Sequence, residues 1–191
     1  MGHTTNGVDA AQAIGRLKQG NKAFLDARTS VGDVSPEMRL HGYEHGQEPY
    51  AVIVACSDSR VIPESMFSAG LGELFVIRVA GNIIDAHQLG SIEYATEHLG
   101  CKLVVVLGHT RCGAVTAAIK GETDGHIKYV TDEIKDAIGD ETDDLAACKL
   151  NVRHSIARIE ESLDIRREEQ QDGLQVVGAV YHLDTGAVEF M

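Results

Sequence analysis

Two apolar runs, at positions 51–55 and 103–107, each lead into a string of polar and thiol side chains. Apolar runs without polar alternation are typical of strands that are buried on both faces of a parallel sheet. The first string, residues 56–60, reads Cys-Ser-Asp-Ser-Arg, and the second, residues 109–112, reads His-Thr-Arg-Cys. In open α/β sheets, ligands bind outside the carboxyl ends of the strands. The two strings therefore predict a ligand site where two buried strands end.

The rest of the chain continues this alternation of strands and helices. Apolar spacing and helix-ending residues predict helices at 9–25, from 63, at 89–99, 112–119 and 145–163, and the acidic stretch 131–144 is predicted to be a solvated helix face plus a loop. Strands are predicted at 51–55, 73–79, from 103, at 174–183 and at 187–190, with residues 28–49 as a loop. Strand–helix–strand order implies a parallel sheet with right-handed crossovers. We expect an α/β fold with a mostly parallel central sheet, consisting of about four parallel strands plus a C-terminal antiparallel strand or hairpin, flanked by helices.

The chain contains no internal repeat and no linker rich in Pro, Gly or Ser, so residues 1–191 are predicted to form a single domain. Within it, residues 1–27 are predicted to form an N-terminal helical arm. Ala13, Ile14 and Leu17 lie on one face of that helix, which is typical of an amphipathic helix. This face predicts docking, either on the main body or on a second subunit.

The composition excludes several classes of partner. With 29 acidic and 17 basic residues the net charge is −12, which disfavours nucleic acid and anionic membranes because both require a basic surface. No apolar run is long enough to span a membrane, and residues 1–13 are too polar for a signal peptide. These observations predict a cytoplasmic protein, in which metal or catalytic roles for cysteine outweigh disulfides. Cys101 and Cys148, which stand outside the two strings, are predicted to be buried structural thiols.

The two strings supply a set of metal ligands. Cys56 ends a strand that we expect beside the strand ending at His109, and Cys112 follows three residues later at the start of a helix. Two thiolates and one imidazole suit zinc with an open fourth position, as in catalytic sites. A His-x-x-Cys pair alone is a weak signal, but the polar residues after Cys56 strengthen it. Asp58 and Arg60, two apart in an extended stretch, are predicted to form a charge-assisted pair.

Both strings resemble motifs of the β-class carbonic anhydrases, Cys-x-Asp-x-Arg and His-x-x-Cys. The resemblance extends over nearly the whole chain: residues 47–49, 72–82, 91–95, 108–115 and 180–186 are similar to blocks of that family. It implies one zinc ion per subunit, held by Cys56, His109 and Cys112, with Asp58 and Arg60 as the catalytic dyad.

The resemblance also implies a reaction and a substrate pocket. The reaction is the reversible hydration of carbon dioxide to bicarbonate and a proton by zinc-bound hydroxide. Gln47, Phe75, Tyr94 and Gly113 match positions that line the small substrate pocket of the family. Family members are dimers or multiples of dimers with active sites at the subunit boundary, so we expect a homodimer or homotetramer.

Two other functions fit the same residues. Carbonyl sulfide and carbon disulfide are linear, apolar molecules that relatives of the family hydrolyse, and the sequence does not distinguish them from carbon dioxide. Alternatively, the zinc would stabilise a structural or sensor module, although the open ligand position and the Asp58–Arg60 pair argue against this. The sequence also leaves open whether Asp58 swings onto the zinc when Arg60 releases it.

Overall fold

The computed structural model describes residues 8–191, so the first seven residues of the predicted arm lie outside the described part. The core is a five-stranded sheet with the strand order β2-β1-β3-β4-β5. Its strands are β1 (Ala51–Ala55), β2 (Leu74–Arg78), β3 (Leu103–His109), β4 (Gln175–Tyr181) and β5 (Val188–Phe190). The first four are parallel, and β5 runs antiparallel to β4. The predicted α/β fold with its C-terminal hairpin is confirmed.

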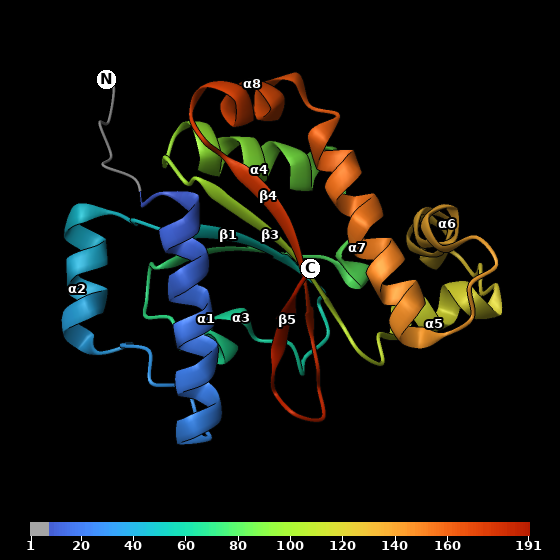
Figure 1. Cartoon of the computed structure of the whole chain (residues 1–191), viewed down its shortest axis with the longest axis horizontal. Helices are drawn as coiled ribbons and strands as arrows, with labels where there is room; N and C mark the ends of the chain where they lie inside the picture. The colour runs from blue at the N-terminus through green and yellow to red at the C-terminus, as the bar shows by residue number, and fades with distance from the viewer. Residues whose placement is uncertain (1–7) are drawn as a thin grey trace.

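Helices cover both faces of this sheet (Figure 1). On one face lie α1 (Ala10–Ala27) and α3 (Pro63–Met66), and on the other lie α4 (Ala86–Glu97), α7 (Asp144–Glu160) and α8 (Leu163–Gln171). A third group packs beyond the carboxyl ends of the strands: the short 3-10 turn η1 (Ala80–Asn82), α5 (Gly113–Lys120) and α6 (Ile127–Ile138). The sites at the strand ends are therefore enclosed by helices.

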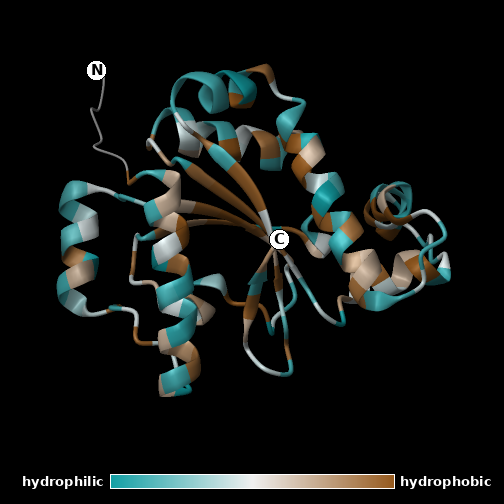
Figure 2. Cartoon of the chain, viewed as in Figure 1, coloured by the Kyte–Doolittle hydropathy of each residue, from teal (hydrophilic) through white to brown (hydrophobic). Residues whose placement is uncertain are grey.

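The alternation of side chains in β1 and β3 explains these layers. Ile53 and Val105 point into the core beneath α1, whereas Val54 and Val106 point into the core beneath α4 and α7. Every residue of β1 and β3 is buried, which explains the continuous apolar runs at 51–55 and 103–107 (Figure 2). Within residues 8–191, no helix combines the length and the hydropathy needed to cross a bilayer.

The prediction of a loop over residues 28–49 was wrong in part, because α2 (Pro36–His45) forms there. Its start has a clear local cause: the Ser35 side chain accepts a hydrogen bond from Met38 N–H, and Pro36 occupies the first turn. None of the ten α2 residues is buried against the rest of residues 8–191. An apolar periodicity reports a buried face, so a helix without one escapes detection by that signal.

The long helix predicted over 145–163 is divided into two. The first, α7, ends at Glu160, and Ser162 caps α8 by accepting a hydrogen bond from Ile165 N–H. Leu163 therefore does not continue the buried stripe of α7, and its side chain is 78% exposed. The apolar spacing continues across this helix boundary by coincidence. The capping residue Ser162 was the sequence signal for the boundary.

The predicted arm docks on its own subunit. Ala13 and Leu17, on the inner face of α1, are fully buried. Gly20 lies so close to Phe67 that an added Cβ would be 1.8 Å from the Phe67 carbonyl oxygen. The Asn21 amide donates to the carbonyls of Met66 and Gly186, at 3.1 and 2.9 Å. Its contacts thus join α1 to α3 and to the β4–β5 hairpin.

Candidate metal centre

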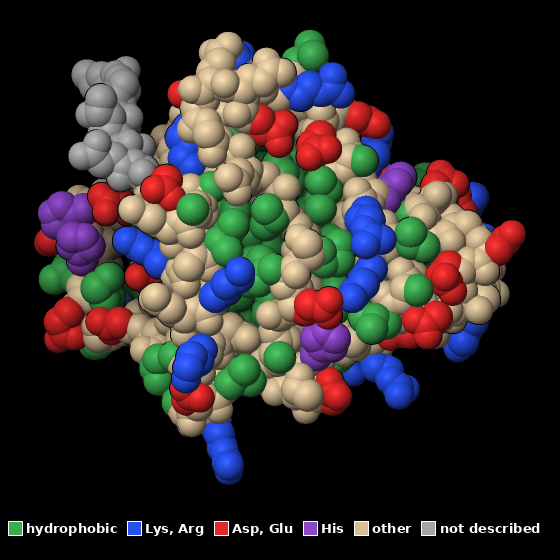
Figure 3. Space-filling model, viewed as in Figure 1, with side chains coloured by type: hydrophobic (Ala, Val, Ile, Leu, Met, Phe, Trp, Pro, Cys, Tyr) green, Lys and Arg blue, Asp and Glu red, His purple; other side chains and the backbone are tan. Residues whose placement is uncertain are grey.

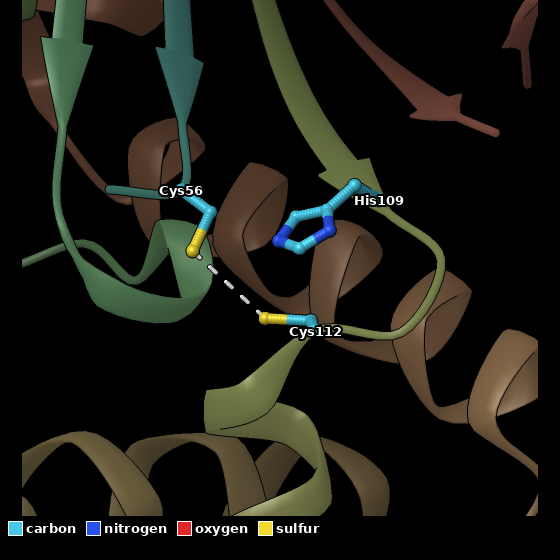
Figure 4. A group of neighbouring side chains, drawn as sticks. All are labelled: Cys56, His109 and Cys112. Atoms are coloured by element: carbon cyan, nitrogen blue, oxygen red, sulfur yellow. Dashed lines mark hydrogen bonds between the residues drawn. The ribbon is translucent and has the colours of Figure 1, made fainter. Parts of the chain in front are cut away.

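Three side chains converge at the carboxyl ends of two neighbouring strands (Figure 4). Cys56 directly follows β1, His109 is the last residue of β3, and Cys112 precedes the first turn of α5. The strands pair in parallel register, with Ala55 opposite Leu107, so both strings leave the sheet at one place. The ligand atoms lie within 4.8 Å of one another, and all three residues are buried. The predicted convergence of the two strings is confirmed.

The imidazole of His109 is prepared for a ligand on one nitrogen. Its Nδ1 lies 3.0 Å from the carbonyl oxygen of Thr110, and since a carbonyl only accepts, Nδ1 carries the proton. The other nitrogen, Nε2, is buried without a hydrogen-bond partner in residues 8–191. Metal-ligating histidines commonly donate their second N–H to such an acceptor, which fixes the tautomer and the ring orientation. The unpartnered nitrogen therefore suits a metal ion.

The two thiols form an electrostatically coupled pair, with Sγ atoms 3.9 Å apart. Hydrogen bonding from Cys112 is the main cause that lowers the pKa of Cys56, and the backbone N–H groups of Gly81 and Asp58 add to it. The same contact, together with burial, raises the pKa of Cys112. The pair thus holds one negative charge readily, and a divalent cation would be needed to favour the second thiolate. This donor set of two sulfurs and one nitrogen fits zinc.

Asp58 and Arg60 form the predicted pair. Arg60 Nε donates to Asp58 Oδ1 at 2.9 Å, and Arg60 Nη2 donates to Oδ2 at 2.6 Å. The geometry arises from a turn, in which Arg60 N–H also bonds Oδ1, rather than from the extended stretch that we expected. The Arg60 side chain holds the pKa of Asp58 well below its usual range, and Oδ2 lies 4.0 Å from His109 Nε2. A carboxylate that is ionised at neutral pH therefore faces the ligand cluster.

Sequence reasoning did not single out Arg78 or Arg111 as residues of this site. Arg78 ends β2 opposite Ala55, and it donates to the carbonyls of Cys56, at 3.2 Å, and Asp58, at 2.6 Å. A cation at the end of the strand neighbouring a ligand-bearing strand was the available signal. Arg111 has a left-handed backbone with φ 58°, and its carbonyl accepts from Arg60 Nη2 at 3.1 Å. Arginine does not favour that backbone conformation, so the residue type gave no signal of it.

The residues expected to line a substrate pocket are divided between the two ends of the sheet. Gly113 adjoins Cys112 at the metal end, whereas the exposed Gln47 precedes β1 and so lies at the opposite end. Phe75 pairs with Val52 in the sheet, three residues before the strands end, which is roughly 10 Å along the strand. The Tyr94 ring lies 6.2 Å from that of Phe75. One copy of the chain thus brings only Gly113 to the metal ligands.

The other two cysteines, Cys101 and Cys148, are buried free thiols, as predicted. Burial raises the pKa of each to about 12, so both stay protonated and neutral. Cys101 donates to the Pro49 carbonyl at 3.1 Å, and both residues lie before the amino ends of β1 and β3, away from the cluster at the carboxyl ends. Within the described residues, one group of three or more His, Cys, Asp or Glu side chains is close enough together to hold a metal ion. It consists of Cys56, His109 and Cys112.

Comparison with known proteins identifies the family. The family model described as carbonic anhydrase matches residues 51–188, which include both strings. The chain is 39% identical to carbonic anhydrase 2 of Mycobacterium tuberculosis, over 95% of this chain and 91% of that protein. It is also 34% identical to a carbonic anhydrase of Mycolicibacterium smegmatis, over 91% of this chain and 89% of the relative.

Solved structures agree with these sequence matches. A Coccomyxa β-carbonic anhydrase in complex with acetazolamide has 26% identity and a TM-score of 0.72, and the match covers 82% of this chain and 78% of that one. The β-carbonic anhydrase CafA of Aspergillus fumigatus has 25% identity and a TM-score of 0.73, with 95% and 89% covered. The sheet, the converging ligands and both kinds of similarity lead to one conclusion: the chain belongs to the β-carbonic anhydrase family of enzymes.

Proposed function

We propose that this protein catalyses the reversible hydration of carbon dioxide to bicarbonate and a proton, with one zinc ion per subunit held by Cys56 Sγ, His109 Nε2 and Cys112 Sγ. The observation that carries the proposal is the position of Asp58. Its carboxylate, fixed by Arg60, lies 4.0 Å from the one ligand nitrogen that lacks a hydrogen-bond partner in residues 8–191. A purely structural zinc site would not require a charged acceptor beside the metal position.

Zinc bound there would supply a Lewis acid that lowers the pKa of a coordinated water from about 15.7 toward about 7. The chain's own residues would orient the reacting groups. Because Arg60 keeps the pKa of Asp58 low, the carboxylate only accepts hydrogen bonds at neutral pH. It would therefore orient the O–H of the attacking group and leave the oxygen lone pair directed at the substrate. The bidentate Arg60 contact fixes the carboxylate in that orientation.

The substrate pocket would be completed by a second copy of the chain. Gly113 lies beside the metal ligands and would offer its backbone N–H, whereas Gln47, Phe75 and Tyr94 lie at the opposite end of the strands. These three residues, supplied by the partner subunit, would provide an amide donor and an apolar wall for a small linear substrate. We therefore propose a homodimer, or a tetramer built from dimers.

Exposed apolar side chains support this assembly. Leu40 and Tyr43 of α2 are 57% and 88% exposed, and Tyr94 is 48% exposed, although large apolar groups generally seek burial. Hydrophobic side chains also gather between α1 and α7, over the half-buried start of β4 (Figure 3). We further propose that the whole chain is one domain and acts in the cytoplasm, because four free thiols suit a reducing compartment.

The experiment combines a zinc assay with stopped-flow hydration of carbon dioxide at several pH values. We expect one zinc per chain, and Asp58→Asn should keep the zinc and the fold but reduce hydration by about 10- to 100-fold or more. Asp26→Asn, which alters an exposed ion pair with Lys22, is the matched control. Unchanged hydration by Asp58→Asn would refute the dyad. Turnover of carbonyl sulfide with negligible hydration of carbon dioxide would refute the choice of substrate.

A further inference from the structure

One face of α7 contacts the second string of the proposed zinc site directly and is linked to the first string through Gly81. The residues at 144, 148, 151 and 155 are spaced by four, three and four positions and so share one helix face. The structure assigns a positioning role to two of them: Asp144 holds the loop between His109 and Cys112, and Asn151 holds the turn that donates to Cys56. The assignment rests on the proposed function for its chemistry, and on the following contacts for its geometry.

Asp144 acts on the loop through the backbone of Arg111. Its Oδ2 accepts a hydrogen bond from Arg111 N–H at 2.8 Å. Arg111 has φ 58°, a left-handed conformation that is strained for a residue with a side chain. The Arg111 carbonyl in turn accepts from Arg60, which orients Asp58. Asp144 therefore stabilises a conformation that aligns the metal ligands and the dyad together.

Asn151 acts on the other string through Gly81. Its Nδ2 donates to the Gly81 carbonyl at 2.8 Å, and Gly81 N–H donates to Cys56 Sγ at 3.3 Å. Asn151 is only 1% exposed, and Ser155, one turn further along, donates to the neighbouring Asn82 carbonyl at 3.0 Å. Buried donors need acceptors, and Asn151 Nδ2 and Ser155 Oγ find theirs in one turn of three residues. The N–H directed at Cys56 is thereby fixed.

Capping of α7 does not account for Asp144. The cap is the preceding residue, Asp143, whose side chain accepts from Ala146 N–H at 2.8 Å. Two adjacent carboxylates thus have separate roles: Asp143 caps α7, and Asp144 binds the loop between His109 and Cys112. This pair supplies a matched control, because each substitution removes one carboxylate from the same helix end.

The first test measures how fast zinc passes from the protein to a chelator, which does not depend on hydration activity. We expect Asp144→Ala to accelerate zinc loss by about 10-fold. Asp144→Asn should stay close to the native rate, because its carbonyl still accepts from Arg111 N–H. Asp143→Ala should lower thermal stability yet leave zinc loss unchanged. Adding Arg111→Gly to Asp144→Ala should restore slow zinc loss, because glycine adopts positive φ without cost.

The inference is overturned if Asp144→Ala and Asp143→Ala lose zinc equally fast, or if Arg111→Gly gives no rescue. If the native protein holds zinc but does not hydrate carbon dioxide, the proposed function fails and this comparison still stands.

For Asn151, the readout is the thiolate charge-transfer band of the cobalt-substituted protein. Asn151→Ala should shift that band, whereas Asn21→Ala, which removes another buried amide donor, should not. Equal bands in both variants would exclude the role of Asn151.

Discussion

The two ends of the parallel strands differ in how complete they are within one copy of the chain. At the carboxyl end, Cys56, His109 and Cys112 are buried and surrounded by fixed hydrogen bonds. At the amino end, Gln47 and the side chains of α2 are exposed. The candidate metal ligands are thus brought together within a single subunit, whereas the residues expected to contact the substrate are not.

The largest effect is expected from the metal ligands. Cys112→Ser should lower zinc content to near zero and abolish hydration, because a serine hydroxyl is a poor zinc ligand. Cys101→Ser is the matched control, since it also alters a buried thiol but lies outside the cluster. Metal analysis by mass spectrometry separates the two. Full zinc content in Cys112→Ser would mean that the carboxyl end is not the metal site.

The second experiment asks whether the amino end serves another copy. Gln47→Ala keeps all three zinc ligands, and Cys112→Ser keeps an intact Gln47. Each variant alone should be inactive or strongly impaired, whereas coexpression should restore hydration, because a mixed dimer contains one site with both parts intact. Activity of the mixture that equals the sum of the separate proteins would place the pocket within one subunit.

The third experiment concerns α1, which contacts both the lead-in to β1 and the C-terminal hairpin. Gly20→Ala should destabilise the protein by about 1–3 kcal/mol, because the added methyl group meets the Phe67 backbone. Gly15→Ala meets no atom within 4 Å and should stabilise the helix by roughly 0.5–1 kcal/mol. Chemical unfolding measures both. Equal effects would show that α1 is not docked on its own subunit.

This docking changes how a deletion of the arm would be interpreted. Removing residues 1–27 would expose Met66 and Phe67, which are 1% exposed in the intact fold, so a change in oligomeric state would not by itself identify an interface on the arm. Substitutions on α2 are easier to interpret, because none of its residues is fully buried against residues 8–191. Tyr43→Glu, for example, should affect association without opening the core.

The smallest effect is a pH dependence of stability. Arg60 lowers the pKa of Asp58 in the folded state, so the pair stabilises the protein above the unfolded Asp pKa of about 3.9. That contribution is lost as pH falls through the lower, folded value. The stability difference between the native protein and Arg60→Ala, both treated with chelator, should therefore shrink from about pH 4 downward. Lys22→Ala is the control for loss of one positive charge, and a difference that grows in acid would contradict the assignment.

Local signals explain what was predicted correctly. The runs at 51–55 and 103–107 identified the two central strands because both faces of each are covered, so hydrophobicity is continuous. The convergence of Cys56, His109 and Cys112 followed, since parallel strands end together and the strings follow them directly. The same logic failed for α2, which has no buried face, and for the α7–α8 boundary, where a capping serine interrupts the stripe that we extended to Leu163.

Chain neighbours and adjacent strand ends suffice to predict the parallel sheet, the convergence of Cys56, His109 and Cys112, and the Asp58–Arg60 pair. The residues that support this group become apparent only in the folded arrangement. Arg78, Asp144 and Asn151 reach the site from other elements, and their contacts are with backbone atoms, which every residue type offers alike. The left-handed turn at Arg111 likewise exists because distant partners hold it, and no local preference of arginine would produce it.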